Sequence, residues 1–101
     1  MSERLHIDVA EGTEPQIVVS LAGDLDLVTA HELRSVLERH AGRSVVLDLS
    51  GVDFVDSTGL VLLMEAARAD GARIALRRGV GPSVARLFQV TKTEGLFAWV
   101  D

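Results

Sequence analysis

The chain has 101 residues, a length that suits one folded domain with one hydrophobic core. It contains no cysteine, which excludes disulfides, thiolate metal sites and cysteine nucleophiles and is typical of a reducing compartment. Its net charge of −5, with one lysine, argues against general nucleic-acid binding, because such binding needs clustered cations.

Apolar patterns along the chain predict four or five short strands. Residues 5–9 alternate apolar and polar side chains, which is typical of a half-exposed edge strand. Three continuous runs rich in Val, Ile and Leu predict strands buried on both faces of a mostly parallel sheet. These runs are residues 17–22, 45–49 and 73–76, and a last short strand is expected at residues 97–100.

Residues at helical spacing occupy the intervals between these runs. A stripe from Leu33 to His40 predicts the first helix, and Thr29 with Glu32 has the spacing of a capping box. The second stripe runs from Leu60 to Ala67, and Gly71 is expected to end that helix. The third helix follows Pro82, a residue favoured at the first helical position.

Alternating strands and helices predict an α/β layer fold with right-handed crossovers. We expect a single domain over residues 1–101, with a mixed, mostly parallel sheet of four to five strands packed with three to four helices. The N-terminus lacks the apolar run of a signal peptide, and no apolar stretch approaches the roughly 20 residues that span a bilayer. A cytoplasmic location without membrane contact is therefore expected.

Three predicted loops follow the carboxyl ends of strands, where open α/β sheets usually meet their ligands. They comprise residues 23–26, 53–59 and 77–83. If the crossovers are as predicted, these loops share one edge of the sheet. The side chains expected there are four carboxylates, one candidate hydroxyl and two arginines: Asp24, Asp26, Asp53, Asp56, Ser57, Arg77 and Arg78.

Ser57 lies at or next to the N-terminus of the second predicted helix. A serine or aspartate at such a place most often caps the helix, so Ser57 or Asp56 is expected as the N-cap. Thr58 and Gly59 can likewise be helix-start residues and nothing more. Position alone does not separate a capping serine from a functional one.

Catalysis is poorly supported by the residues. A nucleophile elbow needs glycine two residues before its serine, and Val55 stands there. The three histidines have neither metal-ligand spacing nor the spacing of a catalytic triad, and no phosphate-binding glycine motif is present. We therefore expect no enzymatic activity, no cofactor and no metal. A small hydrolase or nucleotide-binding enzyme, motivated only by Ser57 on its turn, is the weakest alternative.

Three separated blocks carry a family resemblance. The segment VDFVDSTGL at residues 52–60 resembles the signature loop of STAS domains, specifically of bacterial anti-sigma factor antagonists. GDLD at residues 23–26, with the helix start that follows it, is similar to a second block of that family. VARLF at residues 84–88, followed by GLF at 95–97, resembles its C-terminal helix and last strand. The blocks occur in the right order and cover nearly the whole chain.

The resemblance implies a phosphorylation-controlled partner switch. The unphosphorylated antagonist binds an anti-sigma factor, often a serine kinase, and so frees a sigma factor. Phosphorylation of the serine after the aspartate of the loop, here Ser57, ends binding, and a PP2C-type phosphatase restores it. Thr58 stands where many relatives have a second serine, which leaves a second possible acceptor. Partner contacts are expected at six residues of this edge: Asp24, Asp26, Asp56, Ser57, Thr58 and Gly59.

A second role on the same fold stays open. STAS domains also occur in other assemblies, so a soluble STAS regulatory subunit of a transporter, or a scaffold of a stress-signalling complex, is the alternative to the antagonist.

Overall fold

The computed structural model describes residues 4–12, 16–69 and 74–101. In these ranges five strands and three α-helices alternate along the chain, as the sequence predicts, and a short 3₁₀ turn precedes the last strand. The elements are β1 (Leu5–Glu11), β2 (Gln16–Leu25), α1 (Ala30–Arg39), β3 (Ser44–Val55), α2 (Ser57–Ala69), β4 (Ile74–Arg77), α3 (Pro82–Thr91), the 3₁₀ turn (Glu94–Leu96) and β5 (Ala98–Val100).

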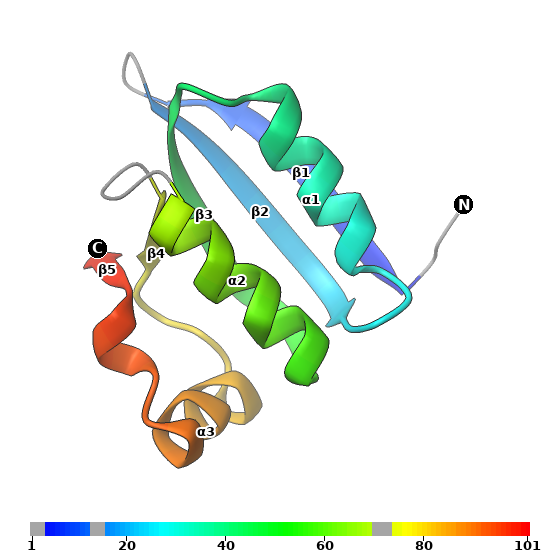
Figure 1. Ribbon diagram of the computed structural model, residues 1–101, viewed down its shortest axis with the longest axis vertical. Helices are drawn as coiled ribbons and strands as arrows, with labels where there is room; N and C mark the ends of the chain where they lie inside the picture. The colour runs from blue at the N-terminus through cyan, green and yellow to red at the C-terminus, as the bar shows by residue number, and fades with distance from the viewer. Residues whose placement is uncertain (1–3, 13–15, 70–73) are drawn as a thin grey trace.

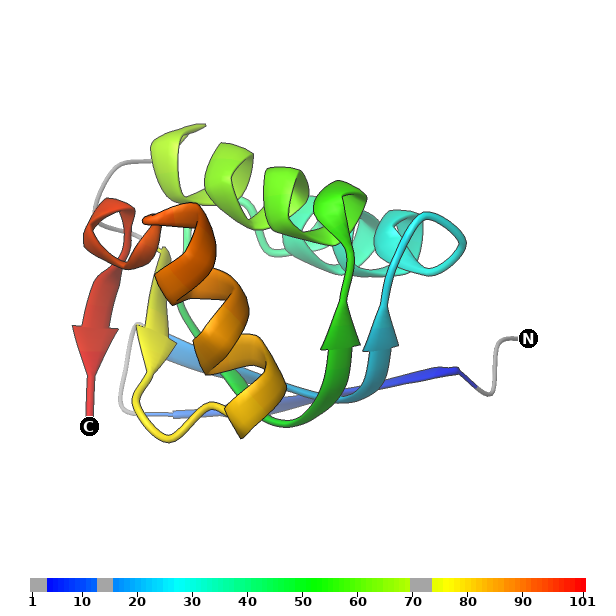
Figure 2. The same cartoon turned by 90° about the horizontal axis from the view of Figure 1, so that it is seen from below.

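The strands form one mixed sheet in the order β1-β2-β3-β4-β5. β1 runs antiparallel to β2, and each later strand runs parallel to the one before it. Every parallel crossover therefore steps in the same direction across the sheet. Right-handed crossovers in one direction place their helices on one face. Figure 2 shows α1 and α2 side by side over that face.

One hydrophobic core lies between the sheet and the helices. Alternate residues of the strands point into it, as with Ile17 and Val19 of β2 and Leu47 of β3. α1 contributes Leu33, and α3 contributes Phe88, which is almost completely buried. All three helices and all strands but the last place buried side chains in this single cluster, so the chain folds as one unit.

The strands are longer at their carboxyl ends than their apolar runs predict. β2 continues to Leu25 and β3 to Val55, so most of the loops expected at residues 23–26 and 53–59 are strand or helix. Two register shifts, between Ser20 and Ala22 and between Gly23 and Asp24, let β3 carry extra residues while pairing continues. Figure 2 shows the ends of β2 and β3 curving towards the helices.

The helix ends match the prediction in part. Thr29 is the N-cap of α1, but its side chain makes no capping bond, so the predicted capping box is wrong. Its hydroxyl instead donates to the carbonyl oxygen of Asp24 at 2.8 Å and accepts the N–H of Asp26 at 3.0 Å. Pro82 begins α3 as expected. Gly71 and residue 73, the predicted ends of a helix and a strand, lie outside the described residues.

No helix within the described residues is both long enough and apolar enough to cross a membrane.

Candidate functional site

α2 begins immediately after β3, and Asp56 provides its cap. One carboxylate oxygen of Asp56 accepts the N–H of Gly59 at 2.9 Å, and its carbonyl oxygen accepts the N–H of Leu60 at 2.9 Å. Of the two expected capping residues, Asp56 is therefore the N-cap. Ser57 is the first residue of the helix, and it is exposed to solvent.

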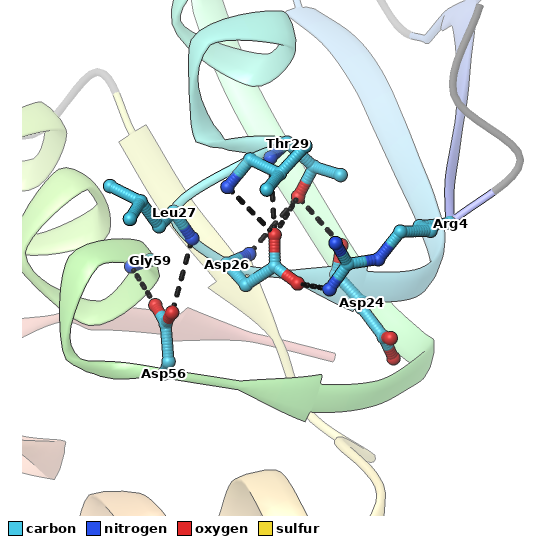
Figure 3. A network of polar contacts seen from close by, with 8 residues as sticks. Arg4, Asp24, Asp26, Leu27, Thr29, Asp56 and Gly59 are labelled. Carbon is cyan, nitrogen blue, oxygen red and sulfur yellow. Dashed lines mark hydrogen bonds and ion pairs between the residues drawn. The ribbon is translucent and has the colours of Figure 1, made fainter.

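Asp56 also joins two loops that are far apart in sequence. Its second carboxylate oxygen accepts the N–H of Leu27, in the β2–α1 connection, at 3.1 Å, as Figure 3 shows. The backbone N–H of Asp56 itself donates to the carbonyl oxygen of Leu25 at 3.2 Å. These bonds hold the start of α2 against the end of β2, so the backbone at Ser57 is fixed in position.

The approach between these elements requires a glycine at position 59. A Cβ atom built there would lie 2.4 Å from the carbonyl oxygen of Leu25, far inside van der Waals contact. Gly59 is buried, whereas Thr58 beside it is half-buried. The glycine of the signature loop thus has a packing role.

Asp26 lies at the centre of a second polar cluster. Its carboxylate accepts the N–H groups of Val28 at 3.0 Å and Thr29 at 3.1 Å, and it pairs with the guanidinium of Arg4 (Figure 3). Only 6% of its side chain is exposed. Burial alone would raise the pKa of Asp26, but the N–H donors of Thr29 and Val28 and the charge of Arg4 hold it below its ordinary value.

Arg4 is a member of this site that the sequence did not reveal. β1 is antiparallel to β2 and pairs Leu5 with Gly23, so the start of β1 meets the end of β2. The N–H of Asp24 donates to the carbonyl oxygen of Arg4 as part of the same pairing. The signal that could have found Arg4 is a hairpin between the first two strands, whose register was not predictable.

The two arginines expected at this edge lie elsewhere. Arg77 is the last residue of β4. On its β3 side, β4 pairs with no more than the first part of that strand. The guanidinium of Arg77 contacts the Asp48 carboxylate at 3.1 Å. Arg78 pairs with Asp101 at 3.1 Å, at the C-terminal side of the sheet. β3 continues seven residues beyond Asp48 to Val55. The prediction that Arg77 and Arg78 share the rim with the carboxylates is therefore wrong, because β4 stops early; Gly81, later in the same loop, does approach the Val52 carbonyl oxygen of β3.

Three exposed apolar side chains lie on the segments that adjoin Ser57. Val61 lies one helical turn after it, on the same face of α2, and is 50% exposed. Phe54, which points away from the core because Val55 points into it, is 50% exposed. Leu27, held by Asp56, is 73% exposed. We refer to Leu27, Phe54 and Val61 as the apolar rim.

The remaining predicted residue, Asp24, is half-buried and lies opposite Phe54 in the sheet register. The site thus brings together Asp24, Asp26, Asp56, Ser57, Thr58 and Gly59 as predicted, at the ends of β2 and β3. Within the described ranges no group of three or more side chains that could hold a metal ion converges. The arrangement offers an exposed hydroxyl amid carboxylates and apolar side chains, which suits binding and modification.

Comparison with known proteins gives consistent matches. The family model described as "Mlab, STAS domain" matches residues 9–98. The anti-sigma-B factor antagonist of Staphylococcus aureus is 31% identical in an alignment of 83 residues, and the match covers 77% of this chain and 77% of that one. The crystal structure of an anti-sigma factor antagonist from Mycobacterium paratuberculosis has a TM-score of 0.79 at 28% identity, covering 94% of this chain and 84% of that one.

A further structural match shows the fold alone. The anti-sigma factor antagonist SpoIIAA in its unphosphorylated form has a TM-score of 0.73 at 19% identity, covering 95% of this chain and 89% of that one. SpoIIAA is also known in a phosphorylated form, with a TM-score of 0.66 over 95% of this chain and 92% of that one.

Proposed function

Because this chain belongs to the STAS domain family, we propose that it is an anti-sigma factor antagonist whose binding ends when Ser57 is phosphorylated. The observation that carries the proposal is the exposed Ser57 at the first position of α2, directly after the capping residue Asp56 and next to segments that carry the apolar rim. A relative that is 31% identical bears the name of an anti-sigma factor antagonist, which supports the same role here.

The predicted contact residues divide by exposure. Ser57 is exposed and Asp24 and Thr58 are half-buried, so we assign them to direct contact with the partner. Asp26 and Gly59 are buried, and the Asp56 carboxylate accepts hydrogen bonds from two backbone N–H groups. These three act by holding the loops in place. The apolar rim, which the sequence did not reveal, supplies the exposed apolar area that a stable interface needs.

Electrostatics makes the switch effective at the interface. A phosphate adds about −1.5 to −2 charges at neutral pH. At the N-terminus of α2 the helix dipole stabilises it by roughly 0.3–1 kcal/mol, while the nearby carboxylates oppose it. Like charges juxtaposed at an interface cost several kcal/mol, and each 1.4 kcal/mol is about tenfold in affinity. One phosphate thus weakens binding by about a hundredfold or more.

The partner and the enzymes that act on the switch follow from the same proposal. We assign the anti-sigma factor as a serine kinase that phosphorylates Ser57, and a PP2C-type phosphatase as the enzyme that removes the phosphate. The antagonist itself then needs no catalytic group, no cofactor and no contact with nucleic acid or membrane. It works in the cytoplasm, where a sigma factor is released.

Incubation with candidate anti-sigma kinases and ATP, followed by mass-spectrometric site mapping, tests the proposal directly. We expect phosphate on Ser57 and none on Thr58. In a binding assay with the same kinase, Ser57→Ala is expected to bind constitutively. Ser57→Asp is expected to bind at least tenfold more weakly, a smaller loss than phosphate causes because aspartate carries less charge.

Ser83 offers a matched control. It is an exposed serine in the first turn of α3, and Ser83→Asp adds the same charge at another helix N-terminus. The affinity of the Ser83→Asp variant for the partner should equal that of the wild-type protein. Equal affinity of Ser57→Ala and Ser57→Asp would overturn the proposal. Recovery of a permease and no kinase from a cellular pull-down would favour the transporter-subunit alternative.

A further inference from the structure

Leu27 and Val28 form an exposed apolar turn between β2 and α1, with side chains that are 73% and 54% exposed. Asp26, the residue before them, closes this turn from within. Its N–H donates to the Thr29 hydroxyl at 3.0 Å, and its carbonyl oxygen accepts the N–H of Ala30 at 2.8 Å. One oxygen of its carboxylate accepts the N–H groups of Val28 at 3.0 Å and Thr29 at 3.1 Å. The conformation of the turn thus depends on the orientation of the Asp26 carboxylate.

Arg4 holds the other oxygen of that carboxylate. Its guanidinium pairs with Asp26, whose side chain is only 6% exposed. The backbone of Arg4 is fixed independently, because its carbonyl oxygen accepts the N–H of Asp24 at 2.6 Å. Figure 1 shows the start of β1 beside the connection from β2 to α1, so the hairpin brings Arg4 to a residue 22 positions away in sequence. The start of the first strand is therefore tied to the exposed turn.

The buried Asp26 carboxylate needs this cation. An ionised side chain that is removed from water is stable only when it is paired and hydrogen-bonded. The other carboxylates next to the turn, Asp24 and Asp56, carry the same sign of charge and cannot replace the arginine. Without Arg4, the second oxygen of Asp26 is driven to turn towards water. That rotation disturbs the hydrogen bonds that close the turn.

A change in the turn also reaches the start of α2. The N–H of Leu27 donates to the Asp56 carboxylate at 3.1 Å, and that carboxylate caps α2. Ser57 follows directly in the sequence. Figure 3 shows the continuous series of contacts from Arg4 to Asp56. Loss of the ion pair at one end of this series is therefore felt at the exposed turn and at the cap of the helix.

We propose that Arg4 is a positioning residue of the partner interface: its ion pair with Asp26 holds Leu27 and Val28 in the orientation in which they meet the anti-sigma factor. Arg4 acts through the turn and is not itself a contact of the partner. This inference rests on the proposed antagonist function, because it names a residue that prepares the same interface.

The first measurement needs no partner. Arg4→Met removes the charge and keeps an unbranched side chain. In the intact ¹⁵N-labelled chain this variant should shift the amide signal of Leu27 and speed hydrogen exchange at Val28 and Thr29 by at least about threefold, because their N–H groups bond to the Asp26 carboxylate. Arg4→Lys keeps the charge and should restore most of the protection.

Arg43 offers a matched control at the opposite end of β1. Its guanidinium pairs with the Glu11 carboxylate at 2.8 Å, but the Glu11 side chain is 65% exposed. Arg43→Met therefore removes an arginine–carboxylate pair without leaving a buried charge behind. The amides of Leu27, Val28 and Thr29 should not change in this variant, and its affinity for the partner should equal that of the wild-type protein.

A double-mutant cycle separates positioning from direct contact, since the Arg4 side chain is 49% exposed. The probe is the anti-sigma kinase that phosphorylates Ser57, and affinities refer to the folded fraction of each variant. Arg4→Met should weaken binding by about tenfold when Asp26 is present. In the Asp26→Asn background no buried charge needs a partner, so the same change should alter the affinity by less than about twofold.

The outcomes separate the alternatives. A loss of affinity that depends on Asp26 and that Arg4→Lys reverses supports the proposal. An equal loss in both backgrounds overturns it, because Arg4 would then touch the partner directly. Unchanged exchange and affinity in Arg4→Met also overturn it, even if the variant is less stable. If Arg4→Met does not fold, Arg4→Gln takes its place with the same expected results.

Failure of the antagonist function has a different signature. In that case the wild-type chain binds no anti-sigma factor, whereas the exchange measurement still shows whether Arg4 holds the turn. A wild-type chain that binds the kinase, together with an Arg4→Met variant that binds it equally well, overturns the role of Arg4 and leaves the antagonist function intact.

Discussion

Asp56 and Asp26 connect different parts of the site. Asp56 links the start of α2 to Leu27, and Asp26 links the β2–α1 connection to Arg4 at the start of β1. Both carboxylates therefore organise the backbone around Ser57 through donors of this chain. If Ser57 is the modified residue of our proposal, such a fixed backbone holds its hydroxyl in one orientation for the enzyme that modifies it.

Removing the Asp56 carboxylate should weaken the fold measurably. Asp56→Ala deprives the N–H groups of Gly59 and Leu27 of their acceptor, and loss of an N-cap costs about 1–2 kcal/mol of unfolding free energy. Urea denaturation measures this value. Asp53→Ala, which changes an exposed carboxylate three residues earlier, should stay within about 0.5 kcal/mol of the wild type. Equal stability of the two variants would contradict the capping role.

The Asp26 cluster predicts a pH dependence of stability. A carboxyl whose pKa is lowered by folding stabilises the native state above its unfolded pKa of about 4, and loses that contribution as pH falls through the folded value. The wild type should therefore be more stable than Asp26→Asn at pH 7, with a difference that shrinks below about pH 4. Thermal unfolding of both proteins from pH 7 to pH 3 tests this. A constant difference would disprove it.

At the scale of the elements, local sequence patterns predicted which helices and strands exist but not the residues at which the strands end. Each helix and strand follows from an apolar stripe or run, and Pro82 marks the start of α3 correctly. The register shifts that prolong β3 depend on contacts with β2, which no local pattern records. The same limit explains Arg4 and Arg77: hairpin register brought Arg4 into the site, and the early end of β4 kept Arg77 out.

The site residues were easier to find than their roles. Asp24, Asp26 and Ser57 all lie at the ends of adjacent parallel strands, as the alternation of strands and helices implied. Burial of Asp26 by Arg4 and exposure of the apolar rim arise from tertiary packing. Those features underlie the proposed division between residues that contact the partner and residues that hold the loops, and they required the structure.

The contact between α2 and β2 predicts the effect of a small substitution. Gly59→Ala forces a Cβ atom against the Leu25 carbonyl, so the start of α2 must shift, at a cost of about 1–3 kcal/mol in unfolding free energy. The shift also displaces Ser57, so partner affinity should fall. Gly95→Ala is the control, since a Cβ there meets nothing within 4 Å and its unfolding free energy should not fall. Wild-type stability and binding for Gly59→Ala would contradict this packing.

At the scale of the whole molecule, one hydrophobic core supports both the candidate site and an aromatic cluster. The site lies where β2 and β3 end, while α3 and the C-terminal segment carry an aromatic cluster. There the centroid of the Phe88 ring lies 5.4 Å from that of Phe97 and 5.7 Å from that of Trp99. The Trp99 indole N–H donates to the carbonyl oxygen of Glu94 at 2.9 Å. A change at exposed Ser57 touches neither the core nor this cluster.

The switch should therefore change affinity without changing stability. Trp99, the one tryptophan of the chain, reports unfolding of the aromatic end, and circular dichroism reports the helices and strands together. For wild type and Ser57→Asp alike, both signals should give one coincident urea transition, with free energies that agree within about 0.5 kcal/mol. The small gain from the α2 dipole and the repulsion from nearby carboxylates oppose each other. A loss above 2 kcal/mol in Ser57→Asp would mean that the variant binds poorly because it unfolds, and would attribute the switch to this domain instead of to its interface.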